Sequence, residues 1–147
     1  MQLANLKAKT YYSKRHSVDI RTGIAYEKYE CRTACNPALN FLYSKFYKEG
    51  KKVMPFDIIR KQFTAKSLAF LYMDDGNKTT HGYCIATLNF DVEEIKKFRK
   101  FLFTKFDLET SMFKDHRIYI KAISAKHFTE LIMPYIHDSM KYKLLSS

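Results

Sequence analysis

Two adjacent aspartates at the end of an apolar run are the residues best suited to chemistry in this chain. The run reads "SLAFLYMDDG" over residues 67–76. It predicts a helix that Thr64 or Ser67 caps at its start. Because the C-terminal end of a helix carries partial negative charge, Asp74 and Asp75 are each unfavourable there by several tenths of a kcal/mol. This cost suggests a bound divalent cation, and carboxylate oxygens are natural Mg²⁺ ligands.

The charge balance favours a polyanionic partner. The 147 residues include 26 Lys and Arg against 15 Asp and Glu, which gives a formal net charge of +11. Nucleic acid fits this charge first and an anionic membrane surface second, while an ordinary solvated surface is the alternative. No apolar stretch approaches the roughly 20 residues of a membrane span. Basic surface and paired carboxylates together predict metal-assisted phosphodiester cleavage.

Cysteine usage and coding bias indicate where the protein is made. Cys31, Cys35 and Cys84 form neither a disulfide framework nor a four-ligand zinc site, so we expect reduced, mostly buried thiols in an intracellular setting. The first residues lack the apolar core of a signal peptide. Richness in Lys, Asn, Tyr, Phe and Ile is typical of AT-rich coding DNA. We therefore expect a protein encoded in an organelle, such as the mitochondrion, or in a phage.

The upstream part of the chain predicts a ββα pattern. Residues 7–33 alternate and are rich in β-forming residues, with a turn at Thr22–Gly23. A helix is predicted to begin at Pro37 and to stop at Gly50. Residues 51–63 read as a short connection that holds one helical turn.

The downstream part predicts the order αββαββα, starting with the helix of the apolar run. Strands are expected over residues 77–90. Asp91, with Glu94 three residues later, forms a capping box for a long helix. A β-hairpin then turns at Asp115–His116, and Ser124 caps a last helix. The fold class is therefore α+β, a mixed α/β unit preceded by a partial ββα repeat.

Three segments resemble the LAGLIDADG homing endonucleases. "LAFLYMDDG" resembles the signature helix of that family. "IMPYIHDSMKYKL", residues 132–144, resembles the closing segment of its intron-encoded branch. "KKVMP", residues 51–55, resembles the Lys-rich connection between the two halves of the monomeric enzymes. The resemblance implies two αββαββα units that pack through their motif helices, with saddle-shaped antiparallel sheets lying in the DNA major groove.

The resemblance divides the chain into two repeats. Residues 1–60 correspond to a partial first repeat without a motif helix, and residues 61–147 correspond to a complete repeat. One motif helix supplies only half of a double-strand cleavage site. We therefore consider an endonuclease completed by a second copy or by a separately encoded half. The alternatives are an RNA-binding descendant, such as an intron maturase or a component of an organellar ribosome, and an inactive remnant.

The resemblance also assigns roles to individual residues. Asp75 occupies the position of the acidic residue that holds divalent cations, expected to be Mg²⁺, against the scissile phosphates. Lys143, and less closely Lys52, match lysines that polarise the attacking water or the phosphate. Ala69 and Met73 are expected on the face that meets the second motif helix.

Nucleic-acid reading is expected to fall to the strands. Long polar side chains on a twisted sheet reach base edges and phosphates. Because strand residues alternate between two faces, only part of any candidate set can point the same way. The candidates are Lys78, Thr80, Tyr83, Thr87, Lys114, Arg117, Tyr119 and Lys121, with Lys14, Arg15, Arg21 and Lys28 upstream.

Overall fold

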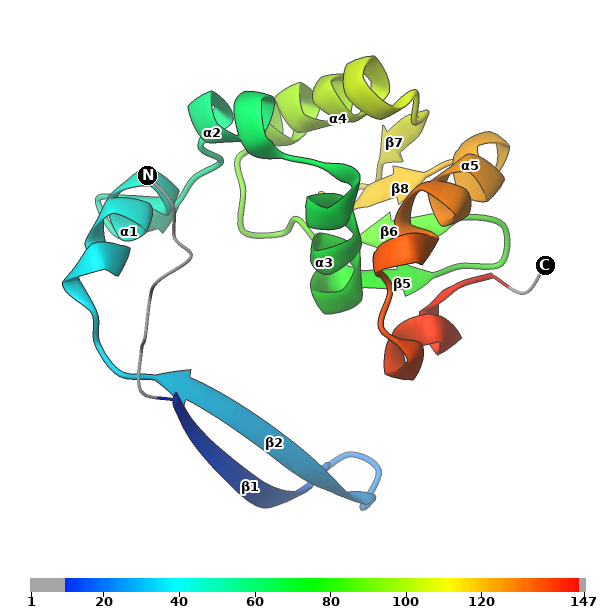
Figure 1. Ribbon diagram of the computed structural model, residues 1–147. Helices are drawn as coiled ribbons and strands as arrows, with labels where there is room; N and C mark the ends of the chain where they lie inside the picture. The colour runs from blue at the N-terminus through cyan, green and yellow to red at the C-terminus, as the bar shows by residue number, and fades with distance from the viewer. Residues whose placement is uncertain (1–9, 146–147) are drawn as a thin grey trace. The chain divides into compact units, whose positions relative to one another are not determined.

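Two compact units make up this protein. The computed structural model describes residues 10–145, and the units divide between Ser44 and Lys45. Figure 1 shows the elements of both units, coloured from blue near the N-terminus to red near the C-terminus. The sequence-based boundary at residue 60 follows the repeat pattern and not compactness, so residues 45–60 belong to the second unit here. The assignment of the repeats themselves stays a prediction.

The first unit is built around one long hairpin. Strands β1 (Thr10–Val18) and β2 (Ala25–Thr33) pair antiparallel along their whole length. The predicted turn is confirmed, because the chain reverses after Thr22 at Gly23, whose φ of 69° favours glycine. A 3₁₀ turn, η2 (Pro37–Leu39), follows the hairpin.

The first helix is shorter than the sequence predicts. Helix α1 covers Asn40–Phe46 and does not reach Gly50. Strands β3 (Tyr47–Lys48) and β4 (Lys51–Lys52) instead form a tight hairpin directly after it. Glu49 and Gly50 both have positive φ, as a two-residue type I′ turn requires. The glycine is therefore a hairpin residue, and our helix end was wrong.

The helix of the apolar run is present as predicted. A seven-residue helix, α2 (Phe56–Gln62), precedes it. Helix α3 (Ala65–Asp75) begins at a capping box in which Thr64 and Ser67 exchange side-chain and backbone hydrogen bonds. The chain then passes directly into an extended conformation at Gly76. The two aspartates are therefore the last two residues of α3, directly before the strand that begins at Gly76.

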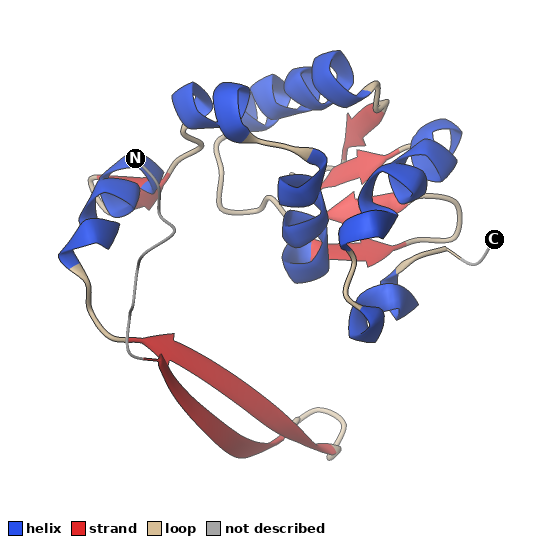
Figure 2. Ribbon diagram, in the orientation of Figure 1, coloured by secondary structure: helices blue, strands red, loops and turns tan. Residues whose placement is uncertain are grey.

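A four-stranded antiparallel sheet follows α3. Its strands are β5 (Gly76–Lys78), β6 (Tyr83–Ile85), β7 (Thr110–Met112) and β8 (Ile118–Ile120). Their spatial order is β5-β6-β8-β7. Figure 2 shows α3 and α5 lying over one face of this sheet. The mixed α+β class with an antiparallel sheet is confirmed.

A long helix connects the two hairpins of the sheet. Helix α4 covers Val92–Phe106, and the predicted capping box between Asp91 and Glu94 is present at its start. It ends at Asp107, which adopts the left-handed conformation with φ of 53°. Its core-facing residues pack beside β7, so α4 covers that end of the sheet.

The last helix begins earlier than predicted. Helix α5 covers Ala122–Ile132, so Ser124 lies inside its first turn and does not cap it. The hydroxyl of Ser124 instead accepts a hydrogen bond from the backbone N–H of Glu109 at 2.9 Å. Two 3₁₀ turns, η3 (Met133–Tyr135) and η4 (Asp138–Lys143), complete the described chain.

One core holds the second unit together. The strand residues Tyr83, Ile85, Ile118 and Ile120 are fully buried on the face that the helices cover. They join apolar residues of the helices in one cluster, which includes Leu68, Ala69, Tyr72, Ile95, Phe98, Leu102, Phe128 and Ile132. Within residues 10–145, no helix has the length and apolar character needed to cross a membrane.

Candidate catalytic site and nucleic-acid surface

The carboxylates at the end of α3 are available to an external ligand. Asp74 and Asp75 are both exposed. Neither carboxylate forms an ion pair with a Lys or Arg among residues 10–145. The backbone carbonyl of Asp75 accepts a hydrogen bond from the N–H of Ala86 at 2.9 Å, which ties the last turn of α3 to the sheet. The side chain is thus held on a fixed backbone while its oxygens stay free.

Lys143 lies at the same end of α3. Its Nζ donates to the carbonyl of Met73 at 2.6 Å, and its own carbonyl accepts from the hydroxyl of Tyr72 at 2.7 Å. Burial raises the pKa of the Tyr72 phenol, so this hydroxyl remains a donor. The ammonium group therefore offsets negative charge where the helix carbonyls end. The catalytic role that the resemblance assigns to Lys143 stays a prediction.

The C-terminal segment, residues 136–145, wraps around this helix end. Nζ of Lys78 donates to the carbonyl of Leu144 at 3.2 Å. The N–H of Leu145 donates to the hydroxyl of Tyr83 at 3.1 Å. We expected Lys78 to contact nucleic acid, but its register places it on the helix-covered side of the sheet. Its ammonium is therefore used to hold the C-terminal segment.

Lys52 and Asp75 line one cavity of about 410 Å³. The lining is mostly apolar, and Nζ of Lys52 lies 5.1 Å from the centre of the Phe90 ring. Helix α3 contributes Ser67, Leu71 and Asp75, which are spaced by four residues and so form one stripe. A groove thus runs along α3 to Asp75, and Lys52 lines the same cavity. The catalytic role that the resemblance assigns to Lys52 stays a prediction.

The exposed face of α3 differs from the predicted one. Ala69 is fully buried and Met73 is half-buried, so both face this chain's own core. Lys66, Phe70 and Asp74, again spaced by four, form an exposed stripe on another face of α3, and Phe70 is 57% exposed. Ala69 and Met73 are therefore withdrawn as contacts to a second helix, and Phe70 is the exposed apolar side chain on this face of α3.

Three predicted nucleic-acid contacts lie on the outer face of the sheet, opposite the helices. Since Ile118 and Ile120 point into the core, alternation places Arg117, Tyr119 and Lys121 on the other side. Arg117 lies over the Phe113 ring, 5.4 Å from its centre, and the rings of Phe113 and Tyr119 are also 5.4 Å apart.

Register adds outer-face residues that the sequence analysis missed. Asn77 pairs with Cys84, which pairs with Tyr119, and Ser111 pairs with Tyr119 from the other side. Asn77 and Ser111 therefore lie on the same face as Tyr119, and Phe113, two residues after Ser111, lies there as well. Strand pairing together with alternation would have identified all three.

Two other predicted contacts are buried. Tyr83 is fully buried, and its hydroxyl is hydrogen-bonded to Thr129 of α5. Thr87 is 3% exposed, and its hydroxyl donates to a backbone carbonyl. A buried side chain cannot reach a base edge, so both are withdrawn. Thr80 and Lys114 remain exposed in the turns beside the strands.

The upstream hairpin presents its basic residues on different faces. Lys14 and Arg15 are neighbours in β1, so they point to opposite sides. Lys14, Arg15 and Arg21 each pair with a carboxylate of the same hairpin, with nitrogen–oxygen distances of 2.5 to 3.4 Å. Exposed pairs of this kind contribute only about 0–1 kcal/mol. The side chain of Lys28 lies outside the described structure.

The metal-binding side chains of this protein suit a site that other molecules complete, and not a site formed by this chain alone. Among residues 10–145, no cluster of three or more His, Cys, Asp or Glu side chains is placed to hold a metal ion. Mg²⁺ keeps several waters and also takes phosphate oxygens, so one protein carboxylate can form part of its shell. Asp75 thus suits a cation that a second carboxylate and the substrate complete.

Comparison with known proteins identifies the family. The family model of the LAGLIDADG DNA endonucleases matches residues 2–131. The chain belongs to this LAGLIDADG family. Intron-encoded endonuclease ai4 of Dictyostelium discoideum is 34% identical over 145 residues, which cover 95% of this chain and 89% of that relative. The resemblance stated from the sequence is confirmed.

Two further LAGLIDADG comparisons concern longer proteins. Cytochrome b mRNA maturase bI2 of Debaryomyces hansenii is 37% identical over 111 residues, which cover 71% of this chain and 42% of the maturase. The solved structure of the homing endonuclease I-WcaI bound to its DNA recognition sequence has a TM-score of 0.79 and 28% identity. That match covers 93% of this chain and 65% of the other, so the chain spans only part of both proteins.

Proposed function

We propose that this LAGLIDADG protein is a divalent-metal-dependent endonuclease that cuts both strands of duplex DNA once a second motif helix joins it. The observation that carries the proposal is the Asp75 carboxylate. It is exposed, without an ion-pair partner among residues 10–145, at a helix end that disfavours negative charge. Membership of the family supports the same reaction.

The chemistry follows from what surrounds that carboxylate. When bound, Mg²⁺ supplies a Lewis acid that activates water and stabilises charge on the oxygens of the phosphate. Asp75 would hold the cation. Lys143 positions the last turn of α3 through the Met73 carbonyl and adds positive charge close to the phosphate. Lys52, on the wall of the same cavity, is the second candidate for that electrostatic role.

The second motif helix would come from a second copy or from a separate chain. The groove along Ser67, Leu71 and Asp75 and the exposed ring of Phe70 are adjacent surfaces of α3. Burying them against another apolar helix is favourable, at about 25 cal/mol for each Å² of apolar surface. Such pairing would bring a second carboxylate beside Asp75, one for each strand of the duplex.

DNA would lie on the outer face of the sheet. Arg117, Tyr119, Lys121 and Asn77 provide donors and a ring in register, and Lys114 lies in the adjacent turn. Arginine and asparagine are the side chains that read guanine and adenine in the major groove. The I-WcaI complex, a solved relative bound to its DNA, supports this use of the fold.

A second candidate is an RNA-binding protein without cleavage activity. The similarity to cytochrome b mRNA maturase bI2 favours it, and the net charge of +11 suits RNA as well as DNA. An intron maturase or a component of an organellar ribosome would have this character. In this case Asp75 holds no metal. Relatives named as intron-encoded support expression from an organelle, such as the mitochondrion, with a phage as the alternative.

Asp75→Asn separates these functions. The variant should lose Mg²⁺-dependent cleavage of duplex DNA while its DNA affinity remains close to that of the wild type. Asp74→Asn is the matched control, because it removes the same charge one residue away, and it should retain cleavage. Wild-type protein that shows no cleavage and prefers RNA to duplex DNA at fixed salt would favour the second candidate.

A further inference from the structure

A basic depression lies at the opposite end of the sheet from Asp75. It lies between α4 and the start of β7, with a volume of about 550 Å³. Strand β5, which follows Asp75, is the first strand of the sheet, and β7 is the last. Its lining includes four basic side chains, which are Lys96, Arg99, Lys100 and Lys121. It also includes the carboxylate of Glu109 and the aromatic ring of Phe103.

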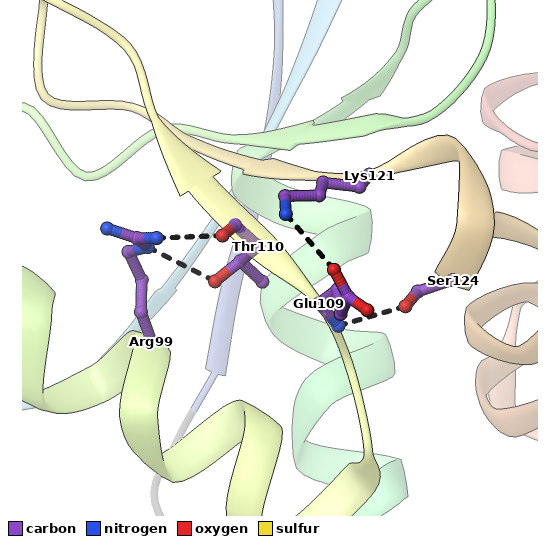
Figure 3. Close-up of polar contacts among 5 residues, drawn as sticks. All are labelled: Arg99, Glu109, Thr110, Lys121 and Ser124. Atoms are coloured by element: carbon purple, nitrogen blue, oxygen red, sulfur yellow. Dashed lines mark hydrogen bonds and ion pairs between the residues drawn. The ribbon is translucent and has the colours of Figure 1, made fainter.

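Arg99 is held in a fixed orientation in this depression. Its Nε donates to the hydroxyl of Thr110 at 3.1 Å, and its Nη2 donates to the Thr110 carbonyl at 2.7 Å. Figure 3 shows these two bonds and the remaining guanidinium nitrogen directed away from Thr110. No residue within 10–145 accepts a hydrogen bond from that nitrogen. The guanidinium is therefore preorganised to donate to an external anion.

The other cations are also available to phosphate. Nζ of Lys100 has no partner among the described residues. Lys121 pairs with Glu109 at 3.0 Å (Figure 3), and Lys96 pairs with Glu93 at 2.7 Å. Exposed pairs of this kind are worth about 0–1 kcal/mol, so a phosphate group can replace either carboxylate. The depression thus offers several phosphate contacts at once.

The exposed ring of Phe103 indicates which nucleic acid fits. It is 55% exposed, and it lies on α4 one turn from Arg99 and Lys100. An aromatic ring among cations is a platform on which an unpaired base stacks. Duplex DNA keeps its bases stacked inside the helix, whereas loops of folded RNA expose them. We propose that this depression binds unpaired nucleotides of an RNA, with phosphates on the basic side chains and a base on Phe103.

Binding of a short unstructured oligoribonucleotide tests the site. Fluorescence anisotropy would compare Lys100→Glu, Phe103→Ala and the control Lys97→Glu, an exposed lysine of the same helix outside the depression. Lys100→Glu and Phe103→Ala should each weaken RNA binding by roughly tenfold. Lys97→Glu should bind RNA nearly as well as the wild type. Duplex DNA affinity should be unchanged in all three variants.

Two further measurements distinguish the phosphate contact of Lys100 from the base-stacking contact of Phe103. Lys100→Gln should reduce the slope of log affinity against log salt by about one, whereas Phe103→Ala should leave the slope unchanged. Equal losses in Lys97→Glu and Lys100→Glu would overturn the proposal, since net charge alone would then explain binding. An equal loss of duplex DNA binding would also overturn it. The assay contains no metal, so its outcome does not depend on cleavage by Asp75.

Discussion

At the scale of single residues, Gly76 fixes how closely α3 approaches the following strand. Its φ of −98° is ordinary, so the need for glycine is steric. A Cβ at this position would lie 2.4 Å from the Tyr72 carbonyl oxygen and 2.1 Å from a carbon of the Tyr72 ring. That ring is held in place because its hydroxyl donates to the Lys143 carbonyl. The glycine of the motif is thus required by packing.

Gly76→Ala should therefore destabilise the protein by about 1–3 kcal/mol, the usual cost of overpacking. Urea denaturation measures the change. Gly23→Asn is the control, because that hairpin position has open space and a positive φ that Asn tolerates. Wild-type stability of Gly76→Ala would show that α3 can shift away from the strand.

The two aspartates carry a stability cost that can be measured. Asp74→Asn and Asp75→Asn should each raise the free energy of unfolding by roughly 0.3–1 kcal/mol, since each removes negative charge at a helix C-terminus. Thermal unfolding without metal is the measurement. A loss of stability in Asp75→Asn would mean that its carboxylate already makes a favourable contact, which would weaken the metal assignment.

Prediction of the site from sequence was most specific where a motif fixed the position. Asp75 follows from the apolar run and the resemblance, and its metal-binding role stays a prediction; the structure leaves its side chain exposed and without an ion pair among residues 10–145. Tyr83, in β6, and Thr87, two residues after the end of β6, were wrongly assigned to nucleic acid, because the list of candidates does not say which of two alternating residues faces the core. Burial of Ile118 and Ile120 decides this for β8, and only then does Tyr119 fall on the outer face.

At the scale of elements, the C-terminal segment supports the end of α3. Lys143→Met should lower the free energy of unfolding by about 1–2 kcal/mol, since the Met73 carbonyl loses a charged donor. Lys141→Met is the matched control, because Lys141 is exposed and, within residues 10–145, its ammonium pairs with Asp138, three residues away. Thermal unfolding and cleavage should be measured on both variants. Unchanged stability with lost cleavage would assign Lys143 to the chemistry alone.

The starts of α3 and α4 were predicted well, whereas the end of α1 and the start of α5 were not. The cap signal at Thr64 or Ser67 located the start of α3, where Thr64 is the N-cap, and the capping box of Asp91 and Glu94 located the start of α4. The end of α1 was missed because Gly50 reads equally as a helix stop and as a hairpin residue. Ser124 looked like a cap, but its hydroxyl holds the backbone of Glu109 and α5 begins at Ala122. The local sequence therefore does not decide where α1 ends or where α5 begins, and tertiary contacts do.

At the scale of the whole molecule, double-strand cleavage requires a second motif helix. Phe70→Glu should convert the paired species into single chains, because it places a charge on the exposed face of α3. Sedimentation equilibrium measures the mass. Phe103→Glu, on an equally exposed phenylalanine of α4, should leave pairing intact. Dissociation by both variants would indicate a general loss of solubility or folding.

The most direct test measures linear DNA produced from supercoiled plasmids that carry a library of the source genome. Linear product is expected from the paired wild-type protein in Mg²⁺. No linear product is expected after chelation, from Asp75→Asn, or from Phe70→Glu single chains. Linear product that persists with Asp75→Asn, or that comes from a single chain without a second motif helix, would contradict cleavage by a paired site that uses Asp75.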